Sequence, residues 1–135
     1  MRNQGSEIHE GPISRFLEED HRRLERLLES AVSERRVVNW DAYDQFRAGL
    51  LRHIGMEEKA LLPVLQRLRG GTPYPQASKL RLDHGALATL LMPPPTPAIL
   101  RAIRAILSVH NRLEEGTDGL YADADRIAPD ETDLL

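Results

Sequence analysis

The sequence predicts an all-α protein, an antiparallel four-helix bundle with up-down-up-down topology, and three observations support this. Apolar residues recur at steps of three and four in four separate segments, which is the spacing of amphipathic helices. Gly-rich or Pro-rich stretches separate several of these segments, and no segment alternates apolar and polar residues as a half-buried strand does. At 135 residues the chain suits one domain, and short connections favour helices that run in opposite directions.

The first two helices are expected to follow a polar N-terminal segment. Residues 1–11 are unpatterned and are interpreted as a flexible arm. The first helix begins at Pro12, because proline is tolerated in a first helical turn. Asn39 or Asp41 can cap the second helix. Pro63 should kink this helix or end its regular part, because proline lacks the amide N–H. The buried stripe of the second helix is predicted to contain Tyr43, Phe46, Leu50, His53, Glu57, Leu61 and Leu65.

The second half of the chain is expected to add two more helices. A Gly-Gly-Thr-Pro break precedes a third helix over about 76–92, and the proline-rich segment 93–97 ends it. A fourth helix follows and ends at Gly116, a natural C-terminal cap. Residues 120–127 can add a short fifth helix. The predicted domain organisation is therefore an arm at 1–11, the four-helix bundle at 12–117, and a short helix with an acidic tail at 118–135.

Composition excludes several classes of site and partner. The chain has no Cys, which excludes a disulfide scaffold, a zinc finger, a thiolate-bound iron–sulfur cluster and a Cys nucleophile. No run of about 18 apolar residues is present and residues 1–12 lack the apolar stretch of a signal peptide, so we expect no membrane contact and a cytoplasmic location. The net charge is −3 with bases and acids interleaved, so no nucleic-acid partner is expected. An aromatic content of 4% gives no interface signal, which leaves the oligomeric state open.

Four of the five histidines fall on a repeated pattern. Each half of the chain has an Asp-His pair on one predicted helix and a His-x3-Glu-Glu segment on the next. The two copies are Asp20-His21 with His53 to Glu58, and Asp83-His84 with His110 to Glu115. Chance does not readily place one histidine on each of four helices in this way.

Helix geometry indicates that the residues of this repeat can form a metal site. Residues four apart lie on the same side of a helix, so His53 and Glu57 point together, as do His110 and Glu114. Two ionised carboxylates inside a bundle need a strong partner, which a pair of di- or trivalent cations supplies. Nitrogen and oxygen ligands without thiolate favour Fe, Mn or Zn over Cu(I). The predicted metal ligands are His21, His53, Glu57, His84, His110 and Glu114.

The residues beside these ligands have two interpretations each. Asp20 and Asp83 can accept a hydrogen bond from a neighbouring imidazole, or can be surface charges. Glu58 and Glu115 point about 140° away from their histidines, which favours surface salt bridges over ligation. Glu115 nevertheless stays an alternative to Glu114 as ligand. Glu18 is an outside candidate.

The remaining polar and aromatic residues are assigned no chemistry. His9 is expected to have no role. The residues interpreted as packing residues are Trp40, Tyr43, Met56 and Tyr74.

The order His21, His53-x3-Glu57, His84, His110-x3-Glu114 resembles the hemerythrin-like HHE cation-binding domain over about residues 13–115. The resemblance implies two non-haem iron ions with an oxo or hydroxo bridge, bridging roles for the two glutamates and terminal roles for the four histidines. The ligand chemistry also permits Mn or Zn.

The sequence is more similar to some members of this family than to others. Oxygen-carrying hemerythrins have a His-x3-His pair on the third helix, where this sequence has Leu80 four residues before His84. Their last carboxylate follows its histidine by five residues, which would select Glu115. The set of four His and two Glu is more similar to di-iron proteins associated with repair of iron centres and nitric-oxide stress. Those proteins carry an additional Cys-containing segment, whereas this sequence contains no Cys.

The resemblance implies a metal-binding protein whose di-iron site engages oxygen, nitric oxide or peroxide, in sensing, scavenging or iron handling. The alternatives are a di-iron oxidase or peroxide-decomposing enzyme at the same residues, and a structural bundle without metal. The sequence identifies no substrate pocket or proton donor near the metals, so we favour a binding protein over an enzyme.

Overall fold

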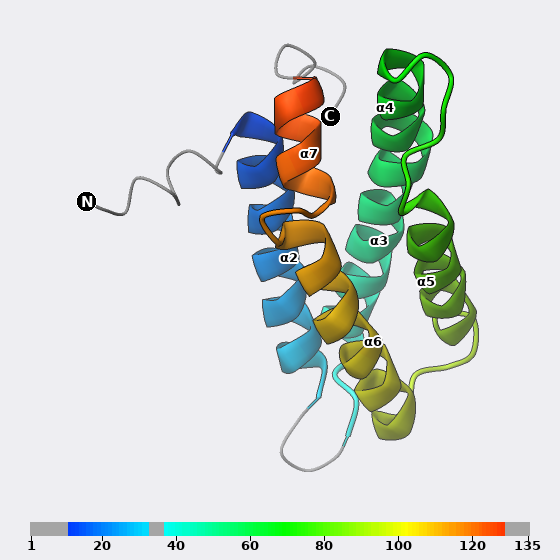
Figure 1. Cartoon of the computed structure of the whole chain (residues 1–135). Coiled ribbons are helices and arrows are strands. Elements are labelled where there is room, and N and C mark those ends of the chain that lie inside the picture. Colours follow the sequence, from blue (N-terminus) through cyan, green and yellow to red (C-terminus); the bar gives the residue numbers. More distant parts are fainter. Residues whose placement is uncertain (1–10, 33–36, 129–135) are drawn as a thin grey trace.

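A computed structural model of the chain describes residues 11–32 and 37–128 and confirms the all-helical prediction over those residues (Figure 1). Their only strand-like pairing is an isolated bridge between Val32 and Val38. The long helices are α2 (Pro12–Ala31), α3 (Trp40–Met56), α5 (Ala77–Leu90) and α6 (Pro97–Glu115). Shorter elements are the π-helical turn η1 (Glu57–Leu61), α4 (Leu62–Leu68) and α7 (Leu120–Ile127). In Figure 1 the chain descends through α2, ascends through α3 and α4, descends through α5 and ascends through α6 and α7.

The N-terminus of α2 is capped from the far end of the chain. No local side chain caps this helix. Instead, the Asp125 carboxylate of α7 accepts hydrogen bonds from the Ile13 amide at 2.9 Å, the Ser14 amide at 3.2 Å and the Ser14 hydroxyl at 2.6 Å. A carboxylate at a helix N-terminus satisfies amides that have no partner within the helix. The cap therefore fastens α7 to α2.

The second predicted helix is interrupted shortly before Pro63. Asn39 caps α3 by accepting a hydrogen bond from the Ala42 amide at 3.2 Å, as one of the two predicted caps. The α-helical part ends at Met56, and in η1 the Leu62 amide bonds the Glu57 carbonyl, one residue further back than in an α-helix. Pro63 then lies in the first turn of α4, directly after this wider turn. The wider turn avoids the clash that a proline ring makes inside an α-helix.

The third and fourth helices follow their predicted breaks closely. Helix α5 ends at Leu90, two residues before the predicted end. The Thr96 hydroxyl caps α6 by accepting a hydrogen bond from the Ile99 amide at 3.2 Å, and Pro97 occupies the first turn.

Two apolar clusters fill the core, one on each side of a polar layer. The first contains Leu17, Leu61 and Leu80 together with Leu120 of α7. The second contains residues further along α2 and earlier along α3, including Leu24 and Leu50 with Leu87 and Leu107. Within α2 and α5 the site histidine lies between a residue of one cluster and a residue of the other. For the histidines of α3 and α6, the residue of the first cluster comes from the element that follows, Leu61 of η1 and Leu120 of α7. The polar residues are therefore closed off from water by apolar layers on both sides.

Two aromatic residues lie outside the core. Phe16 lies on α2, and its side chain is 45% exposed. Trp40 was interpreted as a packing residue, and this is wrong, since it is 55% exposed. It is the first residue of α3 and lies at the edge of the bundle. The centroids of its ring and of the Tyr43 ring are 6.3 Å apart. Tyr43 and Tyr74 are buried, as expected.

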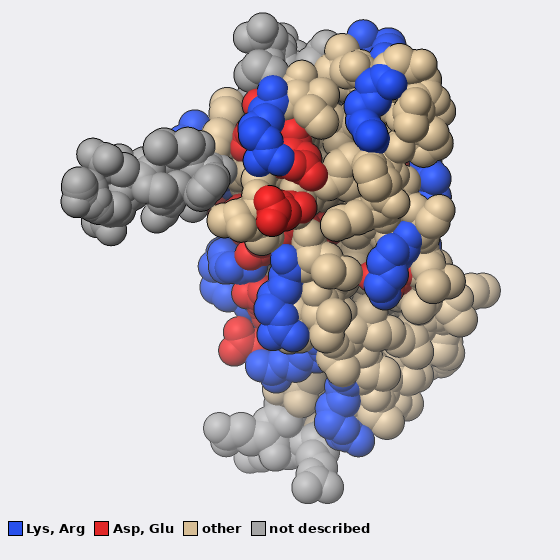
Figure 2. Space-filling view, in the orientation of Figure 1, with Lys and Arg blue, Asp and Glu red and all other residues tan. Residues whose placement is uncertain are grey.

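The surface of the described residues carries mixed charge. Figure 2 shows basic and acidic side chains interspersed along the α2 side of the molecule. Arg22, for example, pairs with Glu25 on its own helix and with Glu115 of α6. None of the described helices is both long and apolar enough to cross a membrane. The predicted arm, His9 and the acidic tail fall on 1–10 and 129–135, outside the described residues.

Candidate metal centre

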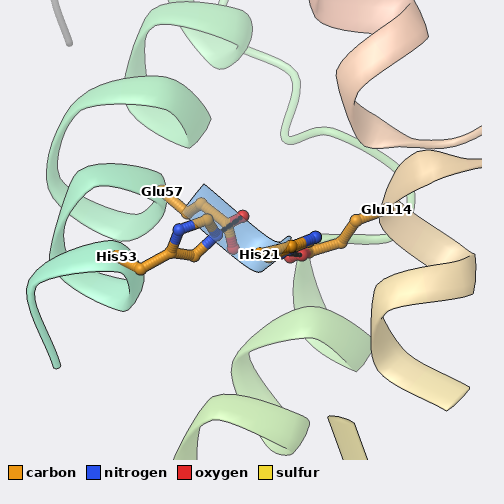
Figure 3. A group of neighbouring side chains, drawn as sticks. All are labelled: His21, His53, Glu57 and Glu114. Carbon is orange, nitrogen blue, oxygen red and sulfur yellow. Dashed lines mark hydrogen bonds and ion pairs between the residues drawn. The ribbon is translucent and has the colours of Figure 1, made fainter. Parts of the chain in front are cut away.

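The structure brings all six predicted ligands together in the middle of the bundle. These side chains form two groups, and within each group the ligand atoms lie within 4.8 Å of one another. Both groups contain Glu57 and Glu114, and every member is buried. Figure 3 shows one group, with side chains from α2, α3, η1 and α6 pointing toward one another. The first group is His21, His53, Glu57 and Glu114, and the second is Glu57, His84, His110 and Glu114.

Each shared carboxylate divides its two oxygens between the groups. For Glu57, Oε2 lies 3.1 Å from His53 Nε2 and Oε1 lies 3.0 Å from His84 Nε2. For Glu114, Oε1 lies 3.1 Å from His21 Nε2 and Oε2 lies 2.9 Å from His110 Nε2. A carboxylate with one oxygen in each of two adjacent sites has the arrangement needed to bridge two cations.

A carboxylate lies behind every one of the four imidazoles. Because an ionised carboxylate can only accept, each histidine Nδ1 donates to it. The pairs are His21 with Glu115 at 2.5 Å, His53 with Asp20 at 2.8 Å, His84 with Glu58 at 2.6 Å, and His110 with Asp83 at 2.9 Å. All four Nε2 atoms are thereby turned toward the shared carboxylates, which is how proteins orient histidines that bind metal.

These bonds decide between the interpretations that the sequence left open. Asp20 and Asp83 are buried and hold imidazoles, so they are not surface charges. Glu115 pairs both with His21 and with Arg22 at the surface, as the salt-bridge interpretation expects, and Glu58 pairs with His84. Neither glutamate belongs to the two groups of ligand atoms. Glu114 has its side chain in both groups.

The electrostatics of the centre favour charged carboxylates. Burial would raise the pKa of Asp20, but hydrogen bonds from His53 and Arg23 outweigh it and lower the pKa to about 2. Burial would also raise the pKa of Glu114, whose contacts with Glu57, His110 and His21 hold it well below its ordinary value.

In the absence of a cation the carboxylates raise the pKa values of the imidazoles. Burial opposes protonation of His53, but its bonds with Asp20 and Glu57 raise its pKa to about 9. Burial likewise opposes protonation of His84, and the Glu114 and Glu57 carboxylates raise its pKa to about 10. Protons on the imidazoles therefore compensate the carboxylates that a metal would otherwise neutralise.

The donor atoms of the second group fit a cation better than they fit one another. Three buried atoms of the second group make no hydrogen bond: Glu57 Oε1, His84 Nε2 and Glu114 Oε2. Glu57 Oε1 and His84 Nε2 are 3.0 Å apart, yet they are not aligned for a hydrogen bond. Leaving such atoms without a partner is costly. A cation between them would satisfy all three, and the nitrogen and oxygen donors suit Fe, Mn or Zn.

Sequence reasoning missed Tyr121. This fully buried side chain of α7 places its hydroxyl among the ligand atoms of the first group. Burial and the Glu57 and Glu114 carboxylates raise the pKa of its hydroxyl well above the ordinary value. Tyr121 follows Glu114 by seven residues, the spacing of two helical turns, which was the available signal. The break at residues 116–119 made that spacing uninformative.

A small apolar cavity adjoins the centre on the side of the second apolar cluster. It has a volume of about 10 Å³, and its walls include all four site histidines together with Leu50, Leu87 and Leu107. That volume holds about one water-sized molecule. A groove of about 380 Å³ between α2 and α6 shares Glu25, Leu107 and Asn111 with the cavity and lies on its outer side.

The comparisons with known proteins agree with the donor set. Residues 13–122 match the hemerythrin HHE cation binding domain, which is more than half of the chain. Neither the curated proteins nor the solved structures yield a match. The matched range begins one residue into α2 and includes Tyr121 near its end. On this evidence the chain belongs to the hemerythrin HHE cation-binding domain family, as its sequence pattern predicted.

Proposed function

We propose that the chain binds two iron ions through His21, His53, Glu57, His84, His110 and Glu114, and that this centre engages dioxygen, nitric oxide or peroxide. The role would be sensing, scavenging or iron handling. The single observation that carries the proposal is the division of the Glu57 and Glu114 oxygens between two adjacent groups of buried donors. Mn and Zn share this ligand chemistry and are the alternative metals.

The scaffold in this proposal is an up-down-up-down antiparallel bundle over residues 12–117. The short helix that follows closes one end of the centre, because it caps α2 through Asp125 and inserts Tyr121. The cytoplasmic location expected from the sequence stays a prediction.

The protein's own residues would perform three tasks at this centre. The four carboxylates behind the imidazoles hold each Nε2 toward the ions and make the imidazoles stronger donors. Glu57 and Glu114 would each offer one oxygen to each ion. The apolar clusters exclude water, which strengthens every charge interaction inside. A bound iron pair would supply open coordination positions and redox chemistry for small molecules.

The cavity argues for a small ligand rather than an organic substrate. A volume of about 10 Å³ holds about one water-sized molecule, which favours a ligand of very few atoms over an organic compound. Oxidation of an organic substrate is therefore disfavoured. Peroxide decomposition fits the same cavity and is the second candidate function.

Metal analysis with a kinetic assay tests the proposal. After anaerobic reconstitution with ferrous iron, we expect two iron ions per chain, one for each group, and their loss when His53→Ala and His110→Ala are combined. Reconstituted protein without bound iron would exclude the proposed function. Exposure to oxygen should then oxidise the iron stoichiometrically. Sustained turnover of peroxide at the same site would favour the enzyme.

A further inference from the structure

One hydroxyl group contacts every donor atom of the first group. The Tyr121 oxygen lies 2.5 Å from Glu57 Oε2, 2.9 Å from Glu114 Oε1, 3.0 Å from His53 Nε2 and 3.0 Å from His21 Nε2. The second group has no comparable oxygen among the described residues, and three of its atoms make no hydrogen bond. The two halves of the centre therefore differ, although the ligand pattern in the sequence repeats.

Hydrogen bonding accounts for at most three of these four contacts, because the phenol oxygen can accept from the two imidazoles and donate to one carboxylate. A phenol has one proton, so it cannot donate to both carboxylates at once. The Tyr121 hydroxyl has four charged or ionisable neighbours within 3.0 Å, which is more than it can hydrogen-bond. Three atoms of the second group, in contrast, have no hydrogen-bond partner.

The distances match those between ligands of one metal ion. Bonds from a first-row metal to nitrogen and oxygen are roughly 2.1 Å, so ligands at right angles on one ion lie about 3 Å apart. The Tyr121 oxygen lies 2.5 to 3.0 Å from each of the four donor atoms. It therefore stands where a fifth ligand of the same ion would stand.

We propose that the Tyr121 oxygen is a ligand of the ion held by His21, His53, Glu57 and Glu114. This inference rests on the proposed function, since it requires metal in the centre. The metal–oxygen bond replaces the O–H bond, and the phenolic proton leaves to solvent, so the step needs no oxidant or reductant.

The surrounding structure holds Tyr121 in this position. Its side chain is completely buried, and α7 is fastened by the Asp125 cap on α2 and by a 2.5 Å hydrogen bond from the Tyr74 hydroxyl to Asp123. Ligation by Tyr121 fills a position on one ion only.

Optical and resonance Raman spectra of the ferric, reconstituted full chain test this ligand. We expect a visible phenolate-to-iron charge-transfer band in the wild type and its loss in Tyr121→Phe. The chain has three tyrosines, and Tyr43→Phe is the matched control, because it removes a buried hydroxyl without touching a donor atom and should keep the band. Iron content and circular dichroism are measured on every variant.

The outcomes separate this inference from the proposed function. Wild type that holds two irons without a phenolate band, or with a band that persists in folded Tyr121→Phe, overturns the tyrosine ligand and leaves the metal centre standing. Wild type that binds no iron contradicts both. If Tyr121→Phe does not fold, ring-deuterated tyrosine in the wild type should shift the Raman bands of the phenolate, and an unchanged spectrum would exclude the ligand.

Discussion

At the scale of single residues, the centre is built from paired side chains rather than from ligands alone. Asp20 on α2 holds the imidazole of α3, and Asp83 on α5 holds that of α6. Glu58 and Glu115 complete the set by holding His84 and His21. The repeat of Asp-His and His-x3-Glu-Glu thus has a physical reason at every charged position, because each His needs both a metal-facing and a carboxylate-facing nitrogen.

Removing one of these supporting charges should weaken metal binding without removing a ligand. Asp20→Asn retains the shape of the side chain but makes the His53 imidazole a weaker donor. We expect the affinity for iron to fall about 10- to 100-fold, measured by competition with a chelator of known affinity. Asp44→Asn, on an exposed position of α3, is the control and should have no effect. An unchanged affinity in Asp20→Asn would show that the bond has no part in ligation.

Metal uptake should release protons and strengthen as the pH rises. Without metal, the pKa of His53 is raised to about 9 and that of His84 to about 10, so near neutral pH both imidazoles carry a proton on each nitrogen. A metal needs Nε2 free, so it must displace those protons, and its apparent affinity should rise with pH until those pKa values are passed. Calorimetric titration in two buffers with different ionisation enthalpies measures the release. A heat that is the same in both buffers would contradict it.

At the scale of secondary structure, the short helix α7 closes the centre. Gly119 permits its approach, because a side chain there would bring Cβ within 2.5 Å of the Leu113 carbonyl oxygen and 2.7 Å of the Glu114 carbonyl oxygen. The turn therefore packs directly on the backbone of the predicted bridging residue. Tyr121 follows two residues later, so its position depends on this contact.

Gly119→Ala should consequently destabilise the chain and displace Tyr121. We expect a loss of about 1–3 kcal/mol in the free energy of unfolding, the usual cost of forcing atoms into a packed region. Chemical denaturation of the metal-free protein measures it. Gly55→Ala is the matched control: its added methyl meets nothing within 4 Å on α3, and alanine is the better helix former by about 1 kcal/mol. Equal stability of Gly119→Ala and the wild type would show that the turn can move without cost.

The sequence predicted those features that depend on residues close together along the chain. The proline-bounded starts of α2 and α6, the Asn39 cap and the convergence of His53 with Glu57 all follow from helical spacing. The Asp125 cap did not, since it joins residues about a hundred positions apart. Trp40 was misassigned because apolar character alone does not reveal that the first residue of a helix can face solvent.

The same limit explains which parts of the site were missed. Six residues were found because the same spacing of His and Glu occurs in both halves of the chain, and the structure brings them together. Tyr121 reaches them through the turn at residues 116–119, and helical periodicity does not predict the path of a turn. Asn111, next to His110 and buried at the cavity wall, gave no pattern either, since it has no counterpart in the other half of the chain.

At the scale of the whole molecule, a near-symmetric bundle has an asymmetric centre. Two helix pairs supply equivalent sets of ligands and supporting carboxylates, with apolar clusters on both sides. Helix α7 then adds Tyr121 to one group only, while the small cavity lies toward the second apolar cluster. The family to which the chain belongs agrees with metal binding, and the shared glutamates are what would make two ions one centre.

Electron paramagnetic resonance of the ferric protein, with iron content measured on the same sample, tests that central claim most directly. Two ferric ions that share Glu57 and Glu114 should couple antiferromagnetically, so we expect two irons per chain, one for each group of donors, and almost no ferric signal. A ferric signal that accounts for all the bound iron would show isolated ions, and would contradict a shared centre.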